Sequence, residues 1–98
     1  MSNGEVISKD DGKTMIDAYQ NNYPSNKKAY LYDATLIQSI LDQEDVTGLR
    51  IYNGERSNGD TCVILVGTNN DGDDLTDGVI VERGKPCPNV CPNNSFFN

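Results

Sequence analysis

The chain has 98 residues, which is enough for one small domain. Fifteen Asp and Glu against eight Lys and Arg give a net charge of −7, which argues against nucleic acid and against a polybasic membrane surface. The sequence contains no His, so it cannot form a Ser-His-Asp or Cys-His catalytic pair. No apolar stretch approaches the ~20 residues of a membrane-spanning helix.

The first predicted element is a helix that begins after Ser8 and ends before Pro24. Ser8 and Asp11 have the spacing of a capping box, in which the serine side chain accepts a hydrogen bond from the backbone three residues on. Proline cannot continue a helix, so we expect Pro24 to end it. The apolar and aromatic residues at helical spacing are Met15, Ile16, Tyr19 and Tyr23.

A strand and a second helix are predicted next. Residues 27–32 alternate as a strand does, with Tyr30 and Tyr32 on one face. Asp33 is expected to cap a helix that ends before Gly48. The apolar stripe of this helix is Leu36, Ile37, Ile40 and Leu41.

Three strands are predicted in the second half, at residues 49–52, 61–66 and 78–82. The polar segment 69–74 is rich in Asn, Asp and Gly and is predicted to be a turn. Regular structure is not expected from Gly84 onward, because proline is placed at Pro86, Pro88 and Pro92.

This order of elements predicts an α+β fold with two helices packed on one face of a small sheet. The sheet is expected to be mostly antiparallel, with about four strands, because consecutive strands are joined as hairpins. We expect a single domain at residues 1–83. An irregular tail rich in Pro, Cys and Asn, residues 84–98, is expected to pack on this domain or to extend from it.

The predicted strand at residues 62–66 is apolar on both of its faces, which is typical of a strand covered on both sides. Two short helices can cover only one face of a four-stranded sheet. We therefore expect the other face to be covered by the tail, through Phe96 and Phe97, or by another subunit.

Cys87 and Cys91 have three residues between them and lie between prolines, which is not the spacing of a thioredoxin-type redox pair. A single turn would bring their Cα atoms within the ~4.4–6.8 Å that a disulfide requires. A local disulfide or a pair of free thiols is therefore the first expectation, a metal site the second and redox catalysis the last. A zinc site would need Cys62 and a carboxylate as further ligands.

Residues 69–74 have the composition of a calcium loop but not its register. Gly72 at the sixth position would put Gly67 first and Gly78 twelfth, where Asp and Glu are required. We interpret the segment as a turn whose charge would hold a cation only loosely, and we expect no cofactor. Arg50 projects opposite Leu49 and Ile51 and is expected to form a surface ion pair.

Four segments carry a resemblance to other sequences: Gly-Leu-Arg-Ile-Tyr-Asn-Gly at 48–54, Val-Ile-Leu-Val-Gly-Thr-Asn at 63–69, Gly-Asp-Asp-Leu at 72–75 and Cys-Pro-Asn-Val-Cys at 87–91. Together they resemble a group of small uncharacterised bacterial proteins. That group has an Arg-Ile-Tyr-x-Gly strand, a strand ending in Val-Gly-x-Asp, a Gly-Asn-Asp-Leu turn and a Cys-Pro-Pro-x-Cys tail. The resemblance implies membership of the group and no particular activity.

No set of residues supplies a nucleophile, a base and an oxyanion donor together, so we interpret the protein as a non-enzyme. The leading hypothesis is a small acidic interaction or self-assembly module, a homo-oligomer that binds itself or a protein partner. The alternatives are a thiol or metal site in the tail and an acidic inhibitor or immunity-type protein that blocks a basic partner. The first residues lack the pattern of a secretory signal, which predicts a cytoplasmic location. The candidate interface residues are Tyr30, Tyr32, Tyr52, Phe96 and Phe97.

Overall fold

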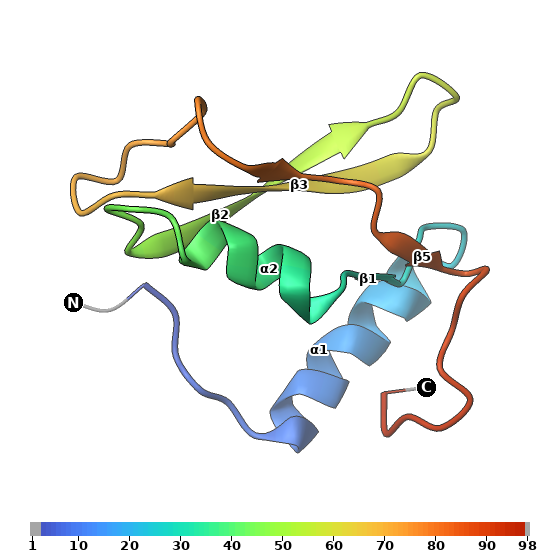
Figure 1. Ribbon diagram of the computed structural model, residues 1–98. Coiled ribbons are helices and arrows are strands. Elements are labelled where there is room, and N and C mark those ends of the chain that lie inside the picture. Colours follow the sequence, from blue (N-terminus) through green and yellow to red (C-terminus); the bar gives the residue numbers. More distant parts are fainter. Residues whose placement is uncertain (1–2, 98) are drawn as a thin grey trace.

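The computed structural model describes residues 3–97, which fold into two helices and five strands. β2, β3 and β4 form an antiparallel sheet, and β1 pairs with β5 in a second, smaller antiparallel sheet. Both helices lie on the same side of the larger sheet, which confirms the predicted α+β class (Figure 1). In chain order the elements are α1 (Lys9–Asn22), β1 (Ala29–Leu31), α2 (Ala34–Leu41), β2 (Gly48–Glu55), β3 (Thr61–Thr68), β4 (Ile80–Val81) and β5 (Lys85–Cys87).

β2 and β3 form a long hairpin in which Gly48 pairs with Thr68 and Glu55 with Thr61. β2 is longer than predicted, because Asn53 and Gly54, which are typical turn residues, continue the ladder instead. The turn lies at residues 56–60, where Gly59 has a φ of +91°, a backbone conformation that only glycine adopts without strain.

The core lies between α2 and the larger sheet. Ile40 of α2 is completely buried against Leu65 of β3 and Val81 of β4. Asp33 occupies the expected position before α2, but its side chain makes no capping hydrogen bond. Four partly buried side chains complete the core, namely Tyr32, Ile37, Leu49 and Val63.

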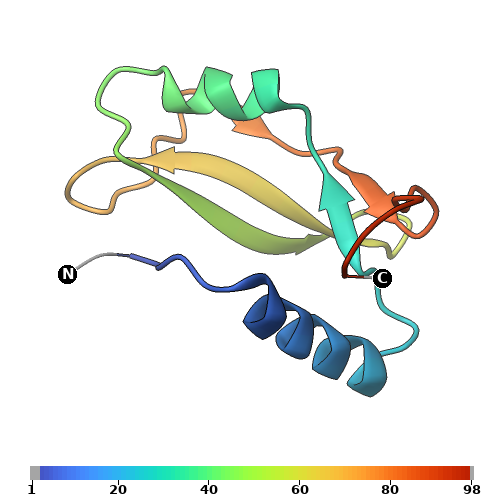
Figure 2. The same ribbon diagram turned by 90° about the horizontal axis from the view of Figure 1, so that it is seen from below.

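α1 begins as predicted, because the Ser8 side chain accepts a hydrogen bond of 3.0 Å from the Asp11 amide. No residue of α1 is buried, and the helix stands apart from the larger sheet in both views (Figures 1 and 2). Its neighbour is the C-terminal tail: the Phe97 ring fills the space beside Gly12, and the Lys9 ammonium lies 4.8 Å from the centre of the Phe96 ring. The tail therefore packs on α1 rather than on the exposed face of the larger sheet.

The expectation of no regular structure after Gly84 is wrong for Lys85–Cys87, which form β5. Proline lacks an N–H and is tolerated where its backbone faces away from the neighbouring strand. Pro86 is such a residue, because its carbonyl accepts a 2.8 Å hydrogen bond from the Val90 amide outside the β1–β5 ladder.

The face of the larger sheet opposite α2 is covered neither by the tail nor by a described helix. Two ion pairs span β3 there instead: Arg50 of β2 bonds to Asp74 at 2.5 Å, and Arg56 bonds to Glu82 at 2.8 Å. Beneath them the exposed fraction of Val66 is 3% and that of Cys62 is 5%. Long charged side chains can cover apolar surface with their stems while the charged ends stay in water.

Candidate functional site

The β2–β3 hairpin has two outer sides, one along β2 and one along β3, and their backbone groups differ in how they are bonded. In an antiparallel ladder, alternate residues point their N–H and C=O groups toward the partner strand and away from it. The Arg56 amide donates to the Asp60 carbonyl across the turn at 2.8 Å. The backbone N–H and C=O groups of the even-numbered residues in β2 and β3 therefore point toward each other. The backbone N–H and C=O groups of the odd-numbered residues point away from the hairpin. We call those of β3 (Thr61, Val63, Leu65 and Gly67) the β3 edge, and those of β2 (Leu49, Ile51, Asn53 and Glu55) the β2 edge.

Every position of the β3 edge has a partner. The Thr61 carbonyl accepts a hydrogen bond from the Tyr30 hydroxyl at 2.9 Å, and the Val63 carbonyl accepts one from the Tyr32 hydroxyl at 2.7 Å. Leu65 pairs with Val81 of β4, and the Gly67 carbonyl accepts a hydrogen bond of 2.9 Å from the Leu75 amide. Neighbouring segments thus close this edge along its whole length.

Tyr32 is held in place by close packing. Its ring lies so near Gly84 that a Cβ atom there would come within 2.5 Å of it, so only glycine fits. Burial and the negative charge of Glu82 raise the pKa of the Tyr32 hydroxyl, which keeps it protonated and able to donate. Tyr30 and Tyr32, two of the predicted interface residues, therefore act inside the fold as caps of the β3 edge.

The β2 edge has no such partners among residues 3–97. No described strand pairs with it, and no hydrogen bond from elsewhere in this part of the chain reaches its outward backbone groups. β2 nevertheless has eight residues, as many as β3. A strand of this length with one unpaired edge is a ready template for another strand, and proteins usually protect such edges.

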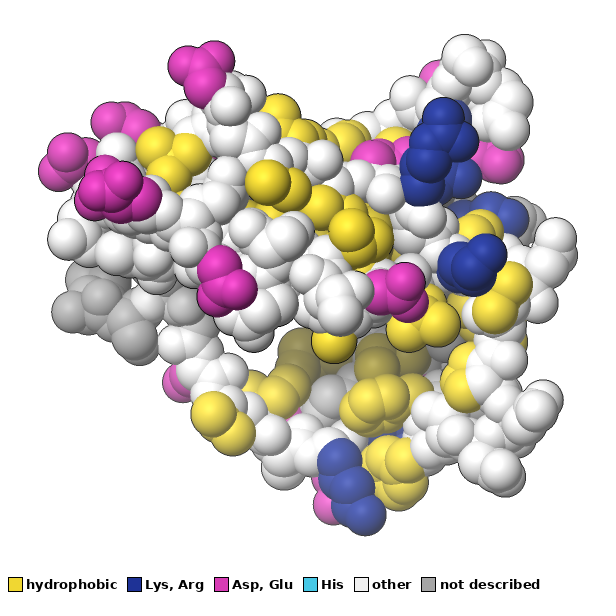
Figure 3. Space-filling model, viewed as in Figure 1, with side chains coloured by type: hydrophobic (Ala, Val, Ile, Leu, Met, Phe, Trp, Pro, Cys, Tyr) yellow, Lys and Arg dark blue, Asp and Glu magenta, His cyan; other side chains and the backbone are white. Residues whose placement is uncertain are grey.

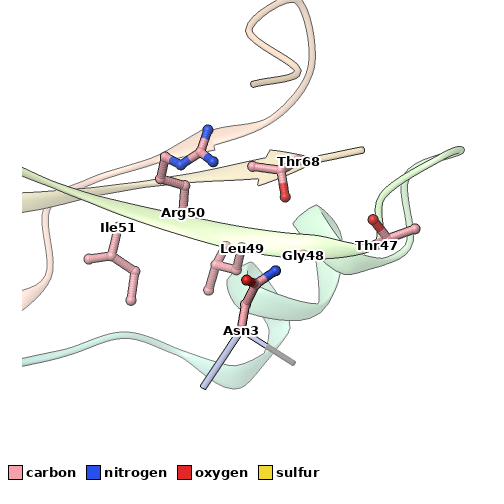
Figure 4. A pocket seen from close by; sticks show the side chains of 7 residues that line it. All are labelled: Asn3, Thr47, Gly48, Leu49, Arg50, Ile51 and Thr68. Atoms are coloured by element: carbon pink, nitrogen blue, oxygen red, sulfur yellow. The ribbon is translucent and has the colours of Figure 1, made fainter. Parts of the chain in front are cut away.

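Side chains on both faces of β2 are exposed at this edge. Ile51 is 58% exposed and Tyr52 is 45% exposed, although the residue opposite Ile51, Leu65, is only 3% exposed. Arg50 lies on one face, while Leu49 and Ile51 lie on the other (Figure 4). A pocket of about 630 Å³ lies along the beginning of the strand, bordered by Asn3, Thr47, Gly48, Leu49, Arg50, Ile51 and Thr68.

Tyr52 and Arg50 are both held by one carboxylate. The Tyr52 hydroxyl donates a short hydrogen bond to Asp74, whose other oxygen accepts from Arg50. The hydrogen bond from Tyr52 and the guanidinium of Arg50 lower the pKa of Asp74. The predicted ion pair of Arg50 is thus confirmed, and the third predicted interface tyrosine has a defined orientation beside the β2 edge.

Apolar side chains continue from the β2 edge onto α1. Figure 3 shows hydrophobic side chains lining a hollow between the larger sheet and α1. Met15 and Tyr19 lie one turn apart on the helix and are 56% and 43% exposed. Tyr19 borders a second pocket, of about 440 Å³, together with Asn53 of β2. The apolar surface of α1 and the β2 edge therefore face the same open space.

Charge is divided between the two ends of β2. The loops at residues 42–45 and 69–77 hold seven Asp and Glu and no Lys or Arg, and the pairing of Gly48 with Thr68 puts both loops at one end. Acidic side chains gather at that end, whereas basic side chains lie at the other end together with some acidic ones (Figure 3). The basic residues near the other end are Lys27, Lys28, Arg56, Arg83 and Lys85.

The acidic segment 69–74 is a turn, as predicted. The Asn69 side-chain carbonyl accepts hydrogen bonds of 3.0 Å from the amides of Asp71 and Asp73. Gly72 has a φ of +83°, the left-handed conformation that favours glycine. Asn69 and Gly72 thus organise the segment through its own backbone.

The cysteines form a clip rather than a metal site. Cys87 and Cys91 are joined by a disulfide with a Cα–Cα distance of 4.7 Å, while Cys62 is a buried thiol in β3. In the part of the chain that the structure describes, no three His, Cys, Asp or Glu side chains converge as metal ligands. The zinc site considered from Cys62, Cys87 and Cys91 is therefore not assembled. Phe96 and Phe97, the remaining predicted interface residues, lie against α1.

Sequence reasoning missed the β2 edge. The strand itself was predicted, but which of its sides is paired depends on strand order, which a single sequence does not give. The signal that was present is the run Gly48–Glu55, in which no proline protects the edge and in which Ile51 and Tyr52 alternate between the two faces.

No protein-family model, curated protein or solved structure matches the chain. Neither described helix is long and apolar enough to cross a lipid bilayer.

Proposed function

We propose that the protein is a non-enzymatic interaction module that binds an extended protein segment by adding it to the β2 edge. The observation that carries this proposal is the contrast between the closed β3 edge and the open β2 edge of the same sheet. In strand addition, the backbone ladder supplies affinity and alternate side chains supply specificity. Ile51 and Tyr52 would contact the two faces of the incoming strand.

The proposal is tested by selecting random short peptides against the whole chain and mapping their binding by amide chemical shifts. Peptides that bind as an added strand are expected to shift and protect the Leu49, Ile51 and Asn53 amides. The same peptides should lose affinity for an Asn53→Pro variant, because proline deletes an outward donor of the edge. Selected peptides that bind only elsewhere, or an absence of binders, would contradict the proposal.

A second candidate function is an acidic inhibitor of a basic partner, which is favoured by the concentration of carboxylates at one end of β2. Such a partner would be attracted over a distance and would lose affinity steeply as salt screens the charges. Binding to a basic test protein that does not change between low and high salt would exclude this candidate.

The cytoplasmic location stays a prediction. The Cys87–Cys91 disulfide favours an oxidising compartment, because cytosolic thiols are usually kept reduced. Alkylation of thiols in intact cells distinguishes the two locations: two unmodified cysteines joined as a disulfide would contradict the cytoplasmic prediction.

A further inference from the structure

We propose that the segment added to the β2 edge is the β2 strand of a second copy of this chain. The two strands would run antiparallel about a two-fold axis and join two three-stranded sheets into one continuous sheet. This inference rests on the proposed function, because it names the partner of the same edge. Closed two-fold dimers are the commonest assemblies of soluble proteins.

The backbone of β2 is suited to pairing with itself. Outward-facing backbone N–H and C=O groups recur at every second residue of β2. A two-fold axis through Ile51 therefore places these groups of one copy opposite the same groups of the other. Ile51 then faces the partner's Ile51, and Leu49 faces the partner's Asn53. Arg50 faces the partner's Tyr52, on the opposite side of the sheet. No two like charges face each other in this register, whereas like charges directly opposite each other would destabilise the pairing.

The distribution of charge favours the antiparallel orientation. The acidic loops 42–45 and 69–77 lie at the Gly48 end of β2, while at the other end the Lys and Arg side chains outnumber the carboxylates of Glu55, Asp60 and Glu82. Antiparallel pairing places the acidic end of each copy beside the basic end of the other. A parallel arrangement would place the two acidic ends together, and like charges at close range destabilise an interface.

The apolar surface beside β2 supplies additional area for such a dimer. α1 lies alongside the β2 edge, beyond the strand (Figure 2). An added strand in the plane of the sheet would lie over the side of α1 that carries Met15 and Tyr19, and would cover Ile51. A stable interface buries about 1,200–2,000 Å² in total, which a backbone ladder alone does not reach. The helices of both copies would complete the contact.

Sedimentation equilibrium of the full chain over a range of concentrations tests this inference. The wild-type chain is expected to follow a monomer–dimer equilibrium, and Asn53→Pro is expected to weaken it by at least about tenfold, because two symmetric hydrogen bonds are lost. Asn53→Ala is the matched control, since it keeps the outward amide and should dimerise as the wild type does. Unfolding in urea at low concentration checks that each variant is folded.

A second variant covers the case in which Asn53→Pro does not fold. Ile51→Lys changes an exposed side chain, and in the proposed register it places two like charges opposite each other, so it should also yield a monomer. A dimer that persists in both variants would overturn pairing through β2.

The outcomes separate this inference from the proposed function. A wild-type chain that is monomeric at every concentration, but whose β2 edge binds selected peptides, would overturn the second copy as partner and leave strand addition standing. A monomer whose edge amides are already protected would mean that another segment of the same chain covers β2, which would overturn both. A monomer to which no peptide binds would also overturn both.

Discussion

The β3 edge and the β2 edge belong to one hairpin, yet the fold treats them differently. The β3 edge is closed by two tyrosine hydroxyls, by β4 and by the Leu75 amide. The β2 edge is left open along eight residues in the described part of the chain, beside exposed apolar side chains. The difference indicates that the chain has the means to protect a strand edge and uses them on one side only. An edge left open in such a small domain is the surface most suited to a partner.

The largest difference in stability between β3 and β2 should come from alanine substitutions at two residues that pair across the hairpin. Leu65→Ala removes a buried core side chain and should lower the free energy of unfolding by about 2–5 kcal/mol. Ile51→Ala, directly opposite, should change the stability of the monomer by less than about 0.5 kcal/mol, as exposed positions do. Urea unfolding at low concentration measures both, and equal losses would show that the two sides are equally buried.

A smaller effect is expected when a cap of the β3 edge is removed. Tyr32→Phe keeps the ring against Gly84 but leaves the Val63 carbonyl without its hydroxyl partner, which should cost about 1 kcal/mol. Tyr30→Phe is the matched control and should cost less, because its hydrogen bond to Thr61 is exposed to water. If Tyr32→Phe left the free energy of unfolding unchanged, the tyrosine would not be closing the edge.

The smallest effect is expected in the loss of stability at acidic pH. The hydrogen bonds from Arg56 lower the pKa of Glu82 from its ordinary value near 4.5 to about 2. Because the unfolded chain binds a proton to this carboxylate first, its contribution to stability is complete above about pH 5 and is lost as the pH falls toward 2. A Glu82→Gln variant should therefore lose less stability between pH 5 and 2 than the wild type in thermal unfolding. Parallel curves for the two chains would contradict this role.

Local features were predictable from the sequence, because the residues that interact are close along the chain. The Ser8 cap, the turn organised by Asn69 and the clip between Cys87 and Cys91 all rest on short spacings. The alternation of β2 likewise indicated that Arg50 would project to the surface.

Long-range features were not predictable. Tyr30 and Tyr32 have the composition of interface residues, and only the folded chain shows that their hydroxyls reach strand β3, thirty-one residues away. Proline at position 86 led to the prediction of no strand there. The sequence does not show that the backbone of Pro86 faces away from β1, where a missing N–H does no harm. The open edge depends on strand order, which depends in turn on where β4 and β1 pack.

Hydrogen exchange of individual amides, measured by NMR at low and at high protein concentration, tests the openness and use of the β2 edge most directly. The Leu49, Ile51 and Asn53 amides should exchange rapidly in dilute protein and slow down as the concentration rises, while the Arg50 and Tyr52 amides, which face β3, stay protected throughout. Protection of the outward amides already in dilute, monomeric protein would contradict the account.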